Sequence, residues 1–219
     1  MKKFALVFAV AAITASAAFA ADAVYSQNAI GFINVEAKAG NIYALTFPFT
    51  DMASTNGLVA FKNTQLAQDA ATGSTVYFWS GTSWMATSKG RNGFTTPYEL
   101  KPGECFFFEP AKDMTITING EVPDDATLSV DITPAANISA VANPYPVKTV
   151  FKDSQLASDA STGSTVYFWN GSAWMATSKG RNGFTTTYEV APGEGFFFET
   201  TAKDTGAMQW TVEKPYAFP

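Results

Sequence analysis

The sequence predicts an all-β protein of two tandem homologous domains, each a small sandwich or barrel, related to one another by pseudo-symmetry. Two observations carry this prediction. Residues 61–109 align with residues 151–199 at a constant offset of 90 positions, and 38 of the 49 aligned residues are identical. Within both copies, apolar and polar residues alternate with the period of two that is typical of half-buried strands. The chain therefore contains one β-rich unit written twice.

The duplication extends beyond this block more weakly. Residues 41–45 correspond to residues 137–141 at an offset of 96, so six residues around positions 50–57 form an insertion in the first copy. We therefore expect a first repeat domain over residues 21–122 and a second over residues 123–219.

Residues 1–20 predict a secretory signal peptide, because two lysines precede an apolar run and the small residues Ala18 and Ala20 flank a phenylalanine. The mature chain is expected to begin at Ala21. The apolar run is too short for a permanent transmembrane helix, and no later run reaches the roughly 18 residues that one requires. We therefore expect a secreted protein, located in the periplasm, at the cell surface or outside the cell, and not a transmembrane one.

A β-hairpin is predicted near the start of each aligned block. Residues 75–79 and 84–87 are rich in aromatic and β-branched side chains and flank a glycine-containing turn. In the second copy this turn contains Asn170 and Gly171, which favours a type I′ turn with positive φ at both central positions. The period of two predicts further strands over residues 114–118, 128–132 and 208–212.

A Pro-Gly turn precedes an aromatic strand in both copies. Residues 101–104 and 191–194 predict type II turns, and each turn is soon followed by three consecutive phenylalanines. Because neighbouring side chains of a strand point to opposite faces, three aromatic residues in a row require both faces to be covered. We therefore expect a central strand that anchors the core, where each buried phenylalanine is worth about 1.5–3 kcal/mol. Short helical turns are expected over residues 58–67 and 147–157.

Several motifs in a fixed order resemble a known family. Residues 28–35 read NAIGFINV, residues 142–144 read ANP, and the second hairpin is followed by PGEGFFFE at residues 192–199. This order of motifs resembles a secreted two-repeat β-protein family of Verrucomicrobia and Planctomycetes, and the resemblance covers nearly the whole mature chain. It implies an exported repeat protein and transfers no catalytic residue.

The composition excludes several classes of function. Removal of Lys2 and Lys3 with the signal leaves 12 basic and 19 acidic residues, so the mature net charge is −7. Such an acidic chain repels phosphate backbones, and no nucleic-acid partner is expected. The chain has no histidine and a single cysteine, so a Ser-His-Asp or Cys-His catalytic set and an intrachain disulfide are excluded. Neither a metal site nor a cofactor is expected.

The segment that follows the hairpin turn is the first candidate binding site. Residues 84–96 are identical to residues 174–186. Aromatic rings stack on sugar or peptide surfaces, and arginine and asparagine supply directional hydrogen bonds, so this segment could form a recognition loop. The alternative, which we favour, is a hairpin connection with solvated cations that was copied by recent duplication. The candidate ligand-binding residues are Trp84, Arg91, Asn92 and Phe94, with their counterparts Trp174, Arg181, Asn182 and Phe184.

The tryptophans, the glutamates and the cysteine are further candidates. Trp79 and Trp84 either pack inward or form an exposed platform, and we expect inward packing because a small β domain needs large side chains in its core. Glu104 and Glu109 are carboxylates that a glycoside hydrolase would need. The simpler interpretation has Glu104 accepting hydrogen bonds from the turn and Glu109 in solvent. We expect Cys105 to be a buried, inert thiol, with an intermolecular disulfide as the alternative.

These features favour a secreted, non-enzymatic structural or interaction protein of the cell surface or extracellular matrix. Strand edges in a repeated β-unit offer self-association between copies. The first alternative is a bivalent carbohydrate-binding module that recognises cell-surface polysaccharide through the repeated aromatic residues. The second alternative, a carboxylate-dependent glycoside hydrolase, is disfavoured by the simpler interpretation of the glutamates.

Overall fold

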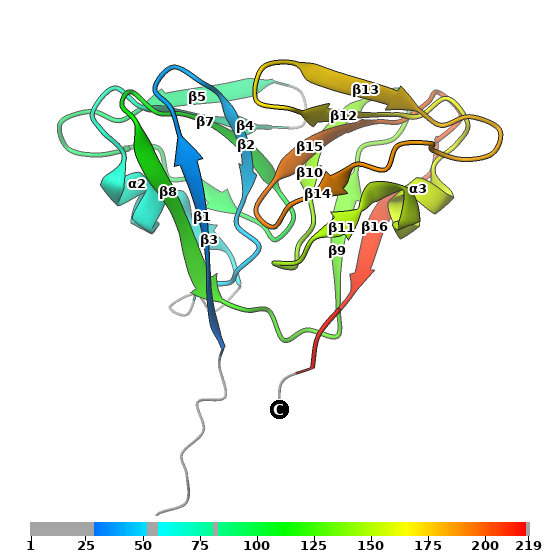
Figure 1. Cartoon of the computed structure of the whole chain (residues 1–219), viewed down its shortest axis with the longest axis horizontal. Coiled ribbons are helices and arrows are strands. Elements are labelled where there is room, and N and C mark those ends of the chain that lie inside the picture. The colour runs from blue at the N-terminus through cyan, green and yellow to red at the C-terminus, as the bar shows by residue number, and fades with distance from the viewer. Residues whose placement is uncertain (1–28, 52–56, 81–82, 218–219) are drawn as a thin grey trace, which may run out of the picture.

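The computed structural model describes residues 29–51, 57–80 and 83–217, and it consists mostly of antiparallel strands. The predicted signal peptide over residues 1–20 lies outside the described residues, as does most of the predicted insertion. The all-β prediction is confirmed, and the same set of sheets occurs twice (Figure 1).

Each repeat contains one four-stranded sheet, one two-stranded ribbon and one short strand pair. The first repeat comprises β1 (Ile30–Ala37), β2 (Tyr43–Thr46), β3 (Val59–Ala60), η1 (Phe61–Asn63), α2 (Gln65–Asp69), β4 (Thr75–Trp79), β5 (Trp84–Ser88), β6 (Glu99–Leu100), β7 (Cys105–Glu109) and β8 (Met114–Glu121). The second comprises β9 (Thr127–Ile132), β10 (Ile138–Ala142), β11 (Thr149–Val150), η2 (Phe151–Asp153), α3 (Gln155–Asp159), β12 (Thr165–Trp169), β13 (Trp174–Ser178), β14 (Glu189–Val190), β15 (Gly195–Glu199) and β16 (Met208–Glu213). The four-stranded sheets have the orders β2-β7-β4-β5 and β10-β15-β12-β13. The ribbons are β1-β8 and β9-β16, and the short pairs are β3-β6 and β11-β14.

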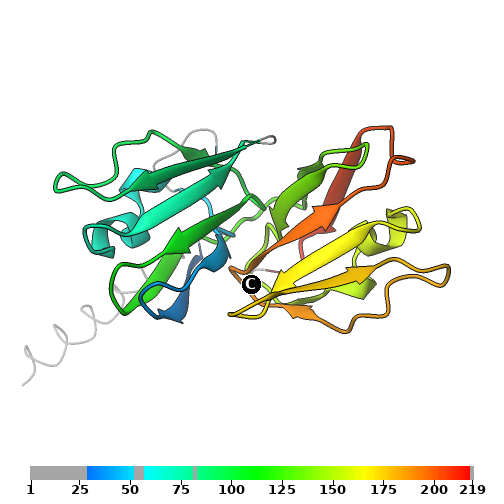
Figure 2. The same ribbon diagram turned by 90° about the horizontal axis from the view of Figure 1, so that it is seen from above.

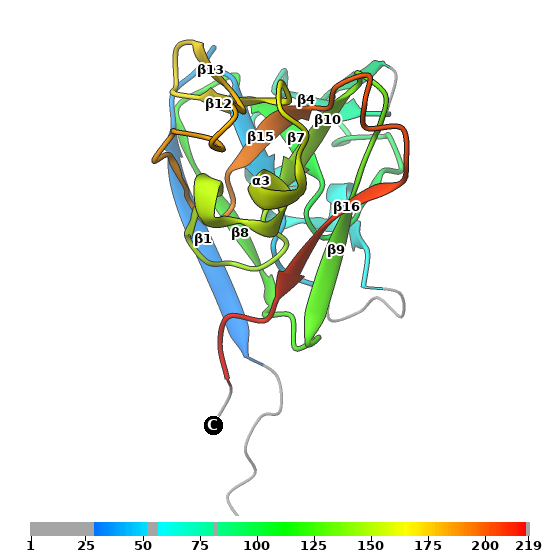
Figure 3. The ribbon, with the colours of Figure 1, turned by 90° about the vertical axis from the view of Figure 1, so that its right-hand side faces the viewer.

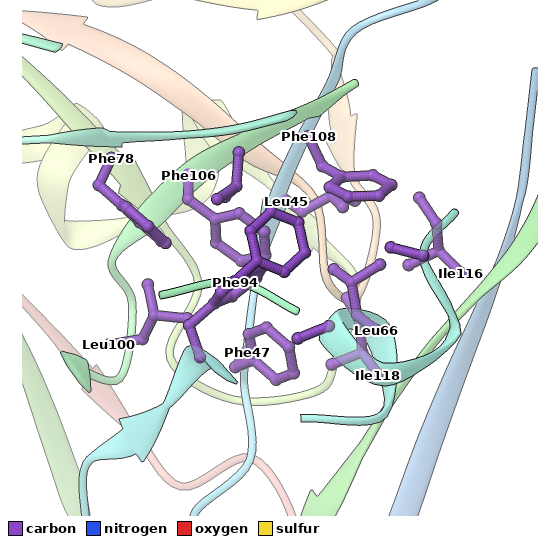
Figure 4. Close-up of a cluster of buried hydrophobic side chains, with 14 of the residues drawn as sticks. Leu45, Phe47, Leu66, Phe78, Phe94, Leu100, Phe106, Phe108, Ile116 and Ile118 are labelled. Atoms are coloured by element: carbon purple, nitrogen blue, oxygen red, sulfur yellow. The ribbon is translucent and has the colours of Figure 1, made fainter. Parts of the chain in front are cut away.

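A hydrophobic core fills the space between the four-stranded sheet and the ribbon of each repeat. In the first repeat, one buried cluster contains Phe78 of β4, Phe106 and Phe108 of β7, and Ile116 and Ile118 of β8 (Figure 4). In the second repeat, α3 lies beside the β9-β16 ribbon and beneath the sheet (Figure 3). The first core draws on residues 33–122 and the second on residues 130–212, so each repeat closes its own core.

The aromatic strand lies at the centre of each sheet, as predicted. β7 is bonded to β2 and β4, and β15 is bonded to β10 and β12. Phe106 and Phe108 enter the core, whereas Phe107 points to the opposite face and is still only 6% exposed. That face is covered by the other repeat, because Phe107 packs with Phe197 in a small cluster between the two domains.

The predicted helical turns are confirmed. A 3₁₀ turn and a short α-helix follow β3, and the same pair follows β11. The side-chain oxygens of Thr64 and Ser154 each accept a hydrogen bond of 3.1 Å from the N–H three residues later, which caps α2 and α3. Among the residues that the structure describes, no helix has the length and apolar character that crossing a bilayer requires.

The turns confirm one prediction and correct another. Gly103 and Gly193 have φ values of +76° and +79°, and the N–H after each donates to the carbonyl three residues earlier, as type II turns require. The predicted type I′ turn is wrong, because Gly171 has a φ of +94° while Asn170 does not have a positive φ. The side-chain oxygen of Asn170 instead accepts hydrogen bonds from two N–H groups later in the turn.

The two repeats are joined by a reciprocal pair of backbone hydrogen bonds. The Thr46 N–H at the end of β2 donates to the Gly193 carbonyl at 2.9 Å, and the Ala142 N–H at the end of β10 donates to the Gly103 carbonyl at 2.8 Å. Each bond runs from the inner strand of one repeat to the Pro-Gly turn of the other, so the two bonds obey the pseudo-symmetry. Each repeat thereby covers part of the inner sheet edge of the other.

Cys105 and Gly195 occupy equivalent positions and face each other at this joint. A Cβ atom added at Gly195 would lie 2.2 Å from the Cys105 Sγ, so the joint has room for one side chain at these two positions. Cys105 is free and fully buried, in agreement with the predicted buried thiol. Burial raises the pKa of this thiol because it disfavours the charged thiolate, and low reactivity follows.

Substitution of Gly195 by alanine is expected to lower the free energy of unfolding by about 1–3 kcal/mol, because the new methyl group overlaps with the Cys105 side chain. The exchange variant C105G/G195C moves the single side chain to the other half of the joint and is expected to recover most of the stability. Urea unfolding of both variants and the parent measures these effects. Equal stability of Gly195→Ala and the parent would contradict the packing described for the joint.

Candidate functional site

Half-buried and exposed aromatic residues gather on the outer faces of the two four-stranded sheets. Because side chains alternate along a strand, Tyr77 and Trp79 of β4 point away from the core. Trp84 of β5 lies opposite Trp79 in the hairpin, with 4.9 Å between the ring centroids. The second repeat is built in the same way, with 5.1 Å between the rings of Trp169 and Trp174.

Rings from both repeats meet at the joint between the domains. Phe107 and Phe197 stack, with centroids 5.4 Å apart and ring planes at 30°. Trp84 contacts these two rings at 5.0 and 5.8 Å, and Trp174 contacts them at 5.7 and 4.8 Å. Two aromatic residues from each repeat thus form a single four-ring cluster.

The cluster borders a surface groove of about 260 Å³, which we name the aromatic groove. It is lined by Ile42, Tyr77, Trp84, Phe107, Trp169, Trp174 and Phe197. Trp84 is 40% exposed and Trp174 is 38% exposed. The expected inward packing is therefore wrong for these two tryptophans, because phenylalanine and aliphatic residues already fill the cores.

The polar residues of the repeated segment lie away from this groove. Trp84 begins β5, whereas Arg91 and Asn92 lie in the turn beyond its last residue, and the strand alone spans about 13 Å. Gly90 and Gly93 close that turn with two backbone hydrogen bonds of 3.1 and 3.2 Å, which leaves the two polar residues exposed at its tip. The same separation holds for Trp174, Arg181 and Asn182 in the second repeat.

Phe94 and Phe184, also candidate binding residues, lie in the two cores. They are 7% and 8% exposed, and their rings pack edge-on against Phe61 and Phe151 with centroid distances of 5.2 and 5.1 Å. We therefore assign these two rings to packing. The structure brings together Trp84 and Trp174 from the candidate set, and it places the other six residues elsewhere.

The lysine of the repeated segment has a structural role that the sequence did not indicate. The Lys89 Nζ donates hydrogen bonds of 2.7 Å to the carbonyl oxygens of Gln68 and Ala70, at the C-terminal end of α2. Lys179 donates to three carbonyl oxygens at the end of α3, at 2.7 to 2.8 Å. The ammonium groups satisfy carbonyls that a helix end leaves without partners. The hairpin of each repeat is thereby tied to its helix.

The carboxylates that a hydrolase would need are engaged in structural hydrogen bonds. Glu104 accepts a hydrogen bond from the Tyr98 hydroxyl and another of 3.0 Å from the Lys101 N–H in the Pro-Gly turn. Glu194 makes the equivalent bonds to Tyr188 and to its own turn. The prediction that Glu104 binds the turn is confirmed, and each tyrosine–glutamate pair braces the turn that contacts the other repeat.

Burial and the same hydrogen bonds shift the pKa values of Tyr98, Tyr188 and Glu194. Burial raises the pKa of Tyr98 and Tyr188, and the bond to glutamate raises it further because the hydroxyl donates only while protonated. Burial also raises the pKa of the Glu194 carboxyl, against the lowering effect of its two hydrogen bonds. Glu109, expected in solvent, is half-buried and accepts a hydrogen bond of 2.8 Å from Tyr77.

A larger cleft of about 630 Å³ lies between the repeats, and its lining includes the carboxylates of Glu99, Glu104 and Asp131. The pseudo-symmetric cleft is about 240 Å³ and is lined by the single carboxylate of Glu194. Of the three acidic residues in the larger cleft, only Glu104 has its counterpart, Glu194, in the lining of the smaller one. Within the described ranges, no group of three acidic or cysteine side chains is placed to hold a metal ion.

Comparison with known proteins does not extend this description. No family model, curated protein or solved structure matches the chain. The geometry of the aromatic groove and of the strands beside it is therefore the basis for any role assigned to them.

The strands β5 and β13 form the outer edges of the two sheets and have the same sequence, WMATS. They lie on opposite sides of the molecule (Figure 2). Each is paired on one side, with β4 or with β12. Trp84, Met85, Trp174 and Met175 of these strands are 38–40% exposed and make up half of the eight large hydrophobic residues exposed in the described part of the chain. β5 and β13 therefore each have one free edge with apolar side chains.

Besides the tryptophans, the groove contains four residues that were not among the candidates: Ile42, Tyr77, Phe107 and Phe197. The middle position in each run of three phenylalanines was a usable signal, because it must face away from the core that its neighbours enter. The position of Ile42 carried no such signal. Its place in the groove depends on how the two repeats meet.

Replacement of Lys89 and Lys179 by methionine is expected to lower the free energy of unfolding by about 1–2 kcal/mol for each site, because the helix carbonyls lose charged donors while the aliphatic stem is kept. Urea unfolding provides the measurement. The matched control is Arg91→Met with Arg181→Met at the exposed turn tips, which should change stability by less than about 0.5 kcal/mol. The same loss in both double variants would refute the helix-anchoring role.

Proposed function

We propose that this chain is an exported, non-enzymatic structural protein that assembles with further copies of itself at the cell surface or in an extracellular matrix. The observation that carries the proposal is the pair of identical free edges, β5 and β13. A sheet edge presents unpaired N–H and C=O groups that bond to another strand unless the edge is blunted. The sequence WMATS contains neither proline nor a charged residue, and its register with the neighbouring strand is continuous.

The hairpin ladder determines which backbone groups face outward. The Lys89 N–H donates to the Ser74 carbonyl at 2.8 Å, so these residues form a bonded pair. Bonded and non-bonded pairs alternate along an antiparallel ladder. Trp84, Ala86 and Ser88 therefore belong to non-bonded pairs, and their N–H and C=O groups point to the free edge. β13 has the same register and presents the same groups.

The placement of the two edges determines the kind of assembly. Because they lie on opposite sides of the molecule, pairing at both edges extends a chain of molecules instead of closing a dimer (Figure 2). Because their sequences are identical, each edge can pair with either edge of the next copy. Antiparallel pairing would join the four-stranded sheets of neighbouring copies into a longer sheet. A shared binding partner gives a physical reason for the identity of residues 84–88 and 174–178.

The non-enzymatic part of the proposal rests on the glutamates. Glu104 and Glu194 are occupied by bonds to tyrosine and to the turn backbone, and Glu109 by a bond to Tyr77. Export rests on the signal peptide predicted over residues 1–20 and agrees with the resemblance to secreted two-repeat proteins.

Recognition of cell-surface polysaccharide is a second candidate function. The exposed rings of Trp84 and Trp174 favour it, because aromatic side chains stack on sugar surfaces. Both rings belong to one groove, so this candidate takes the form of a single site and not of a bivalent module.

Replacement of Ala86 and Ala176 by proline is expected to abolish assembly and preserve the fold. Each proline removes an N–H that points to the free edge, and no hydrogen bond within the hairpin is lost. In light scattering and sedimentation, the mature parent chain should form species that grow with concentration, while the proline variant should remain a monomer. Far-UV circular dichroism checks that the sheets are retained.

The matched control is Ala86→Thr with Ala176→Thr, which changes the side chains but keeps both N–H groups. It should assemble as the parent does. A parent chain that stays monomeric at high concentration would contradict the proposal, and so would a proline variant that assembles as readily as the threonine control.

A further inference from the structure

The side chains that line the aromatic groove offer few hydrogen-bond acceptors. Six of its seven residues are aromatic and the seventh is Ile42. The Tyr77 hydroxyl is already used as a donor to Glu109. The indole nitrogen of Trp169 is buried and has no acceptor among the described residues. The lining therefore supplies no carboxylate, amide or aliphatic hydroxyl, although a bound sugar needs such groups around its own hydroxyls.

A cation that carries no N–H group suits this lining. The face of an aromatic ring is electrostatically negative and attracts a cation that lies within about 6 Å of the ring centroid, and tryptophan is the strongest of the three ring types. A quaternary ammonium group is surrounded by carbon atoms, so it requires no hydrogen-bond acceptor. Its surface also packs well against apolar walls. The groove offers three indoles of this kind, from Trp84, Trp169 and Trp174.

The charges around the groove have the complementary sign. Tyr77 links the lining to the Glu109 carboxylate, and Tyr167 makes the same bond to Glu199 in the second repeat. No lysine or arginine is among the lining residues, and the whole chain has a net charge of −5. A negative field attracts cations and opposes anions, so it discriminates against phosphate or carboxylate ligands.

We propose that the aromatic groove binds a quaternary ammonium group, of the kind carried by choline and by trimethylated amines. The stacked rings of Phe107 and Phe197 form the floor, because they are the more buried members of the cluster. Trp84 and Trp174 stand at 78° and 73° to the Phe107 ring and form the walls. Both repeats contribute, so the site exists only when the two domains are joined. It does not require the proposed assembly, because all seven lining residues belong to one chain.

The test is a titration of the mature chain with choline, followed by tryptophan fluorescence and calorimetry. The matched ligand is 3,3-dimethylbutan-1-ol, in which a carbon atom replaces the charged nitrogen, and cellobiose is the sugar control. Choline is expected to bind saturably and at least about tenfold more tightly than the neutral alcohol. Three results would overturn the inference: no saturable binding of choline, equal binding of the neutral alcohol, or binding of cellobiose alone.

Variants locate the binding in the groove. Trp84→Leu with Trp174→Leu removes two ring faces but keeps apolar side chains, and it should weaken choline binding by about tenfold or more. The matched control is Phe32→Leu, which removes a 72% exposed aromatic ring from β1, outside the groove, and should bind choline as the parent does. Equal weakening in both, or in neither, contradicts the proposed site.

A second pair of substitutions guards against loss of the fold in the tryptophan variant. Glu109→Gln with Glu199→Gln keeps acceptors for the two tyrosines and removes two negative charges. It should weaken choline binding severalfold and leave binding of the neutral alcohol unchanged. Unchanged choline affinity in this variant would contradict the electrostatic part of the proposal.

The proline variant at Ala86 and Ala176 separates this inference from the proposed assembly. Its substitutions leave all seven lining residues in place, so the monomeric variant should bind choline as the parent does. Choline binding that survives without assembly supports the groove alone. Choline binding that is present in the parent and lost in the monomer would overturn a site contained within one chain.

Discussion

The two hydrogen bonds between inner strands and Pro-Gly turns determine the relative position of everything else in this structure. Such a bond needs a turn that approaches the other repeat closely, and Gly103 allows it, since a Cβ atom there would lie 2.3 Å from Val130. Glu104 braces the turn from within its own repeat. Once the two sheets are fixed in this way, Phe107 and Phe197 stack across the joint and the aromatic groove forms. Neither repeat could form that groove alone.

Aromatic residues serve two separate purposes in this fold. Phenylalanines fill the two cores, and tryptophans lie mainly on the outer faces of the sheets. The identical segment over residues 84–96 has three structural roles. It supplies a free strand edge, a lysine that anchors the helix, and the core ring of Phe94. These three structural roles give a physical reason for part of the identity between the copies without a ligand at the loop tip.

Local signals in the sequence were sufficient for the strands, the type II turns and the short helices, because alternation and Pro-Gly pairs act within a few residues. The Asn170 turn was predicted wrongly, since its side chain caps the turn and removes the need for a second positive φ. The prediction that Trp84 packs in a core was wrong, because its exposure depends on how the two repeats meet, which its local sequence does not indicate. The groove itself arises from contacts between residues about 90 positions apart, which no local pattern reports.

Cys105 and Gly195 limit how alike the two halves of the gene can become. At a symmetry axis a residue meets its own counterpart, and two cysteines here would place their Cβ atoms 2.8 Å apart, closer than the roughly 3.5–4.5 Å of a disulfide. Two glycines would instead leave the space empty. The hairpins of the two copies can therefore be identical, whereas packing disfavours the same residue at both of these positions.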